Sequence, residues 1–75
     1  MRLYRFAGFT LRHIPGKNEH LSCVVELEHK ASGQLYHYHK DFFTNVHPQW
    51  RAIVVIFFEA GRLLDGKTVA GWELR

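Results

Sequence analysis

The spacing of hydrophobic and polar residues predicts a first β-strand over residues 2–14. Tyr4 and Phe6 alternate on even positions, whereas Ala7, Phe9 and Leu11 alternate on odd positions. A β-bulge at Ala7-Gly8 would reconcile the two halves, because glycine inside a strand often marks a bulge. The turn-forming segment Pro15-Gly16-Lys17-Asn18 then ends the strand.

Two further strands follow, over residues 20–29 and 34–43, joined by the loop Lys30-Ala31-Ser32-Gly33. The second strand alternates cleanly, with one face made of Leu21, Cys23, Val25 and Leu27. If the loop closes with His29 opposite Gln34, the apolar residues of the two strands share a face. That register pairs Leu27 with Tyr36, Val25 with Tyr38 and Leu21 with Phe42.

A helix is expected to begin near Pro48, a favoured first helical residue, with Asn45 or His47 as the candidate cap. It ends near Leu64, before the C-capping segment Asp65-Gly66. A last strand over residues 67–74 is expected to bury Ala70, Trp72 and Leu74. The order is therefore β-β-β-α-β, which predicts a single α+β domain over residues 1–75. It consists of one mostly antiparallel sheet with a single helix packed on one face.

The run from Ile53 to Phe58 is apolar throughout, although a helix covering one sheet needs only an apolar stripe. With Trp50 as the zero of a helical wheel, one set of residues lies within roughly 80° of it. We expect this set to face the sheet: Ile53, Val54, Phe57, Phe58, Ala60, Gly61 and Leu64. The solvent side is marked by Arg51, Glu59 and Arg62, with Val55 among them. A further apolar ridge is left over, made of Ala52, Ile56 and Leu63.

Two interpretations account for this ridge. It packs under the first strand or the 43–47 loop, or it forms a self-complementary patch in a homodimer, since small domains commonly gain stability by oligomerising. The second interpretation makes the chain a small non-enzymatic interaction module, homodimeric or docking a larger protein through the helix and the sheet edge. Its partner interface would be Ala52, Ile56, Leu63 and Val55.

The composition of the chain narrows the classes of protein and of function that remain open. A chain of 75 residues with 47% hydrophobic residues can form a core, and its longest apolar run is too short to cross a membrane. The single Cys23 is expected to be an inert core residue, and the lack of a signal peptide favours a cytoplasmic protein. The net charge of +3 makes nucleic-acid binding the alternative function. The basic residues that folding would have to gather for it are Arg51, Arg62, Arg2 and Arg12.

Six histidines raise the question of a metal site. His37, His39 and Asp41 share one face of the third strand, and the expected register brings Glu26 opposite His37. Imidazole and carboxylate groups are suitable zinc ligands, so these four residues are the candidate ligands. A solvated sheet face with Glu–His pairs across the strands accounts for the same pattern, and we favour it over a metal site or hydrolytic chemistry. No phosphate-binding loop is present in the sequence, and no cofactor is expected.

Overall fold

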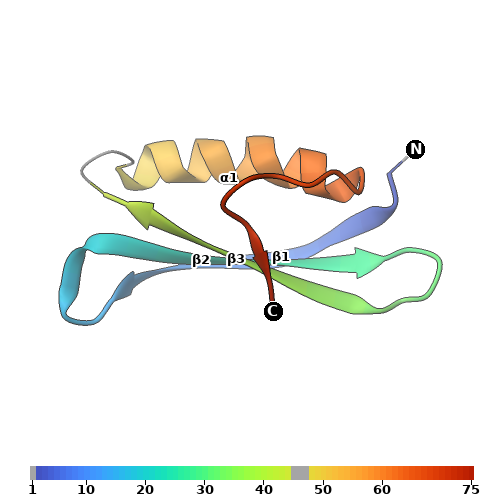
Figure 1. Cartoon of the computed structure of the whole chain (residues 1–75), viewed down its shortest axis with the longest axis horizontal. Coiled ribbons are helices and arrows are strands. Elements are labelled where there is room, and N and C mark those ends of the chain that lie inside the picture. Colours follow the sequence, from blue (N-terminus) through green and yellow to red (C-terminus); the bar gives the residue numbers. More distant parts are fainter. Residues whose placement is uncertain (1, 45–47) are drawn as a thin grey trace.

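In the part of the chain that the structure describes, four antiparallel strands form one open sheet, and a single helix lies along one face of it (Figure 1). The computed structural model describes residues 2–44 and 48–75. The sheet has the order β1-β2-β3-β4. Its strands are β1 (Tyr4–Ile14), β2 (Lys17–His29), β3 (Leu35–Phe43) and β4 (Glu73–Leu74), and the helix is α1 (Gln49–Leu64). The predicted β-β-β-α-β fold is confirmed.

The pairing of the first three strands also follows the prediction. The register of β1 against β2 shifts between Phe6 and Gly8, which is the expected bulge. In the loop between β2 and β3, the backbone N–H of His29 donates to the carbonyl oxygen of Gln34 at 2.8 Å. The predicted partners across β2 and β3 are those observed: Leu27 with Tyr36, Val25 with Tyr38, Leu21 with Phe42 and Glu26 with His37. Burial of a single apolar face was sufficient to determine this register.

The bounds of α1 agree with the prediction at both ends. Pro48 directly precedes the first helical residue, and the candidate caps Asn45 and His47 lie outside the described residues. At the other end the N–H of Gly66 donates to the carbonyl oxygen of Leu63 at 2.9 Å. Gly66 has a φ of +80°, and a Cβ there would approach Leu3 Cδ1 to 2.6 Å. The left-handed backbone favours glycine at this position, whereas the exposed end of the Leu3 side chain could move aside for a Cβ.

Most of the predicted final strand has no regular strand structure. Only Glu73–Leu74 pairs with β3, whereas strand geometry was expected from residue 67 onward. A turn containing Gly71, at a φ of +91°, intervenes before Trp72. Strand alternation does not apply across this turn. Trp72 is buried as expected, but Ala70 and Leu74 are exposed and Val69 is buried instead.

The core lies between α1 and the sheet. From the sheet it takes the residues whose parity predicted burial, and from the helix it takes one narrow side. Both helix and sheet contribute mainly aliphatic side chains, and the 65–72 segment closes the layer over β3. The buried residues of the core are Leu21, Cys23, Val25, Leu27, Phe42, Ala52, Ile56, Ala60, Leu63, Leu64, Val69 and Trp72.

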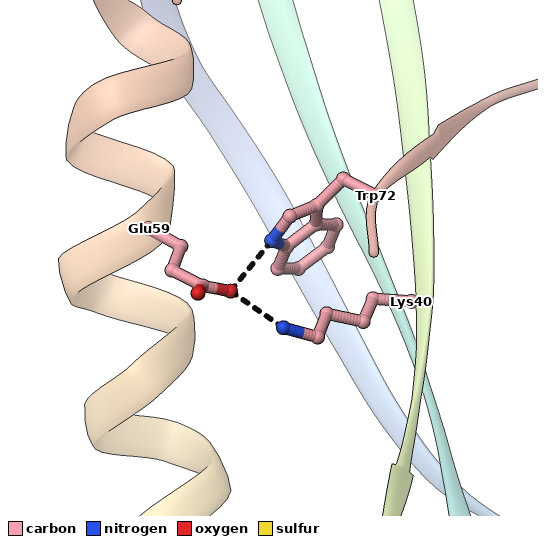
Figure 2. Close-up of polar contacts among 3 residues, drawn as sticks. All are labelled: Lys40, Glu59 and Trp72. Carbon is pink, nitrogen blue, oxygen red and sulfur yellow. Dashed lines mark hydrogen bonds and ion pairs between the residues drawn. The ribbon is translucent and has the colours of Figure 1, made fainter. Parts of the chain in front are cut away.

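One polar cluster joins the helix, the sheet and the C-terminal segment (Figure 2). A single carboxylate oxygen of Glu59 accepts hydrogen bonds from Lys40 Nζ at 2.7 Å and from Trp72 Nε1 at 2.9 Å. The side chains of the ion pair are only 18% and 21% exposed. Lys40 Nζ also lies 5.0 Å from the centroid of the Phe42 ring. Glu59 was expected on the solvent side of the helix, and that prediction is wrong because its charge has a partner on β3.

Replacing Glu59 by alanine should destabilise the fold. Loss of one partner leaves a largely desolvated ammonium group on Lys40 and an unpaired indole N–H on Trp72. We expect Glu59→Ala to lower the free energy of unfolding by about 2 kcal/mol, since the pair is not fully buried. Urea denaturation measures this. The control Glu19→Ala, at an exposed strand position, should change stability by no more than about 0.5 kcal/mol. Equal effects of the two substitutions would contradict the role given to the cluster.

Cys23 gives the stability of the fold a dependence on alkaline pH. Burial raises the pKa of its thiol from 9.0 to about 11, an effect that the nearby Lys40 only partly offsets. Between these values the unfolded chain releases the proton while the folded chain retains it, so rising pH favours unfolding. From pH 8 to pH 10 the wild type should lose about 1.4 kcal/mol more than Cys23→Ala. Urea titrations at the two pH values measure the difference, and parallel pH dependences would contradict the prediction.

Candidate docking surface on the helix

The side of α1 that faces away from the sheet is also apolar. Four of its residues are more than half exposed: Trp50 at 63%, Val54 at 60%, Phe57 at 58% and Phe58 at 72%. With the spacing i, i+4, i+7 and i+8 they occupy about 100° of the helix circumference. We call these four residues the apolar stripe. A second apolar face of this width, in addition to the one that fills the core, is the feature of the surface that most requires an explanation.

The apolar stripe continues onto the sheet at β1. The ring of Phe57 meets the ring of Phe9 edge to face, with 5.9 Å between the centroids. Phe9 in turn lies 6.3 Å from Phe6, and both β1 rings are more than a third exposed. At Phe57 the stripe therefore reaches the flank of α1 that lies above β1, which is an edge strand of the sheet.

The residues predicted for the partner interface lie in the core instead, because α1 is rotated about its axis from the expected position. Of the set expected to face the sheet, Ala60 and Leu64 are buried as predicted. Ala52 and Ile56 are fully buried and Leu63 is 4% exposed, all in the core between helix and sheet. Val55 is half-buried and packs against the same core. The ridge predicted to be left over is thus the side that covers the sheet, which agrees with the first of its two interpretations in placing it in the core.

Side-chain size was the signal that could have identified the correct face. The buried side of α1 carries Ala52 and Ala60, whose small side chains let the helix approach the sheet closely. The exposed side carries Trp50, Phe57 and Phe58, which would hold it farther away. Hydrophobicity alone does not distinguish the two faces, whereas the volumes of these residues do.

The four arginines proposed for nucleic-acid binding do not form one surface. Arg51 and Arg62 are exposed on α1, and the guanidinium of Arg51 lies 5.2 Å from the centroid of the Trp50 ring. Arg2 forms an ion pair with Asp65 at 3.7 Å. Arg12 lies on the opposite face of the sheet, opposite Ser22 of β2. Arg2 also lies beside α1 near Gly61, so three of the four arginines are on the helix side of the sheet and Arg12 is on the outer face.

The histidine and acid residues do lie together on the outer face of the sheet, away from α1. His37 Nε2 is 3.4 Å from Glu26 Oε1, and both residues border an open depression of about 320 Å³. His39 is nearly buried, and its Nε2 lies 2.8 Å from Ser22 Oγ and 3.1 Å from Asp41 Oδ1. Among the described residues, no group of three or more His, Cys, Asp or Glu side chains could hold a metal ion.

This Ser–His–Asp group does not have the geometry of a catalytic triad. In a triad the serine and the acid bind different nitrogens of the imidazole, so that a proton can pass to one while the other is oriented. Here Ser22 and Asp41 both contact the same nitrogen of His39. The arrangement is that of a paired polar sheet face, in keeping with the interpretation favoured from the sequence.

Comparison with known proteins adds no assignment, since no family model, no curated protein and no solved structure matches the chain. No helix in residues 2–44 and 48–75 is long and apolar enough to cross a membrane.

The observed rotation of α1 reverses the expectations for two neighbouring positions. Ile56→Ala removes a side chain from the core and should lower the free energy of unfolding by about 3 kcal/mol. Val54→Ala, on the stripe, should change it by no more than about 0.5 kcal/mol. Urea denaturation of both variants at micromolar concentration makes the comparison. A larger loss for Val54→Ala would restore the face assignment expected from the helical wheel.

Proposed function

We propose that this chain is a small, non-enzymatic protein-interaction module that docks through the apolar stripe of α1 and the adjoining edge of β1. The observation that carries the proposal is the exposure of Trp50, Val54, Phe57 and Phe58 on one side of a helix whose other side fills the core. Keeping four such residues in water is unfavourable unless a partner covers them.

The chemistry of the stripe suits a protein partner. Aromatic residues dominate the energetics of protein–protein interfaces because they bury a large area at a small cost in conformational entropy. The stripe carries three of them, and the arginines beside it would form a polar rim. A partner helix could lie along the stripe, while an extended strand could pair with β1. A cytoplasmic location is part of the proposal, since a reducing compartment keeps the Cys23 thiol free.

Nucleic-acid binding remains the alternative, and one contact favours it. Trp50 with Arg51 stacked on it offers an aromatic and a positive charge together, as single-stranded nucleic acids require. Against it stands the position of Arg12, which faces away from the helix side of the molecule. The outer face, which carries Glu26 and Asp41, is also unfavourable for contact with phosphates.

Site-specific photo-crosslinking tests the proposal. Benzoylphenylalanine at position 58, in cells of the native host, should give adducts with protein, while the same group at the exposed Lys30 should not. The adducts should disappear when Val54→Asp is added, because a carboxylate in the stripe opposes its desolvation. A captured protein, once purified, should bind the wild type and lose at least tenfold in affinity for the Val54→Asp variant.

The other outcomes decide against the proposal. Adducts that nuclease digests would support the nucleic-acid alternative. Equal labelling from positions 58 and 30, or adducts that persist with Val54→Asp, would remove the stripe as the docking surface.

A further inference from the structure

We propose that the stripe and the β1 edge bind a second copy of this chain, about a two-fold axis that stands perpendicular to the sheet beside β1. In this homodimer the two β1 strands pair antiparallel, and the two α1 helices lie side by side on the same face of a continuous eight-stranded sheet. The inference rests on the proposed function and specifies its partner.

The first argument is that the apolar stripe and the open edge of β1 adjoin on the same side of the molecule. The stripe extends from the outer side of the helix to the flank above β1, where Phe57 meets Phe9. The opposite flank of the helix is directed toward β3, where Glu59 contacts Lys40. One symmetry operation placed beside β1 therefore brings strand edge to strand edge and stripe to stripe. A partner lying on the crest of the helix would leave the edge of β1 unused.

The second argument is the spacing of the two helices. Along the sheet, α1 lies closest to β1 and β2. Because adjacent strands are about 4.8 Å apart, a helix centred between β1 and β2 lies about 2.4 Å inside β1. The two-fold axis lies about the same distance outside β1, so the two helix axes are about 10 Å apart. Packed helices are separated by about 8–10 Å, so both contacts form in the same assembly.

The third argument is the position of the axis along the strand. α1 and β1 run in opposite directions (Figure 1). The middle of the stripe, Val54, is about 4.5 Å from Phe57 along the helix. Along a strand this distance corresponds to between one and two residues. Because the two elements run in opposite directions, Val54 lies level with residues that follow Phe9 in β1. The axis therefore passes near Thr10 or Leu11.

Pairing about this position centres the contact on the regular part of β1 and keeps Arg12, the charged residue within it, away from its own copy. Bulges and charged residues both discourage pairing. The bulge lies between Phe6 and Gly8, outside the regular stretch from Phe9 to His13. With the axis at Thr10 or Leu11, Arg12 faces Gly8 or Thr10 of the other copy. No arginine of β1 then faces an arginine of its partner.

The available area is sufficient for a stable dimer. The stripe with Phe6 and Phe9 exposes roughly 600 Å² of side chain per copy, taking each aromatic residue at about 150–250 Å². Stable interfaces bury about 800 Å² per partner. Pairing of the β1 edges adds the remainder, and it also satisfies backbone groups that a helix contact alone would leave to water.

Sedimentation equilibrium and light scattering test the inference at about 100 μM, a concentration that saturates a micromolar dimer. The wild type should show twice the 8.8 kDa mass of the chain. Phe57→Asp should shift it to the mass of one chain. The matched control is Leu35→Asp, which alters a residue of similar exposure on β3, and this variant should remain dimeric.

Cysteine crosslinking supplies a readout that does not depend on a disruptive substitution. A residue on the two-fold axis faces its own copy within disulfide range. Oxidation should therefore give a covalent dimer for either Thr10→Cys or Leu11→Cys and none for Thr68→Cys, at an exposed position near the C-terminal segment. The native Cys23 is buried and does not interfere.

Several results would overturn the homodimer. They are a monomeric wild type, a Phe57→Asp variant that stays dimeric, and the absence of a covalent dimer from both β1 cysteines. If the chain is a monomer and binds vesicles of anionic lipid, the stripe is a membrane-binding surface instead. A monomer that still gives stripe-dependent adducts with another protein in cells would leave the proposed function standing while the homodimer fails.

Discussion

The contact between Glu59, Lys40 and Trp72 determines which side of α1 meets the sheet. The helix is apolar on two sides, so burial of hydrophobic area alone would stabilise more than one rotation about its axis. A largely desolvated carboxylate has no such freedom, since it requires the ammonium group of Lys40 on β3 and the indole N–H of the C-terminal segment. Rotating α1 to bury Trp50 would move Glu59 out of reach of both donors. A polar contact thus gives a hydrophobic core its orientation.

The rest of the surface follows from this orientation. With Glu59 directed at β3, the opposite flank of the helix must overlie β1, and it brings Phe57 to Phe9. The large aromatic residues, which the close approach at Ala52 and Ala60 excludes from the core, are collected beside the edge strand. The same constraint that organises the interior therefore also places the stripe next to unpaired backbone, and these are the two elements from which an interface can be built.

The strands could be predicted from the sequence far better than the helix face. Alternation has a period of two, so one apolar face determined the register of β2 and β3, and the glycine at position 8 marked the bulge. The ends of α1 followed from Pro48 and Gly66, whose backbone preferences are local. The rotation of α1 did not follow from hydrophobicity alone: the small side chains of Ala52 and Ala60 were the local signal for it, and the partner of Glu59 lies 19 residues away in the chain. The turn at Gly71 likewise interrupts a segment whose composition resembles a strand.

One of the two tryptophans lies in the core and the other lies on the exposed stripe. Trp72 is buried, and its indole N–H donates to a carboxylate, whereas Trp50 is largely exposed at one end of the stripe. Emission from an indole is sensitive to the polarity of its surroundings, so the two side chains sense separate events in one molecule. Trp72 responds to the integrity of the core, and Trp50 responds to whatever covers the helix. The chain thus carries an intrinsic optical probe for its folding and another for its association.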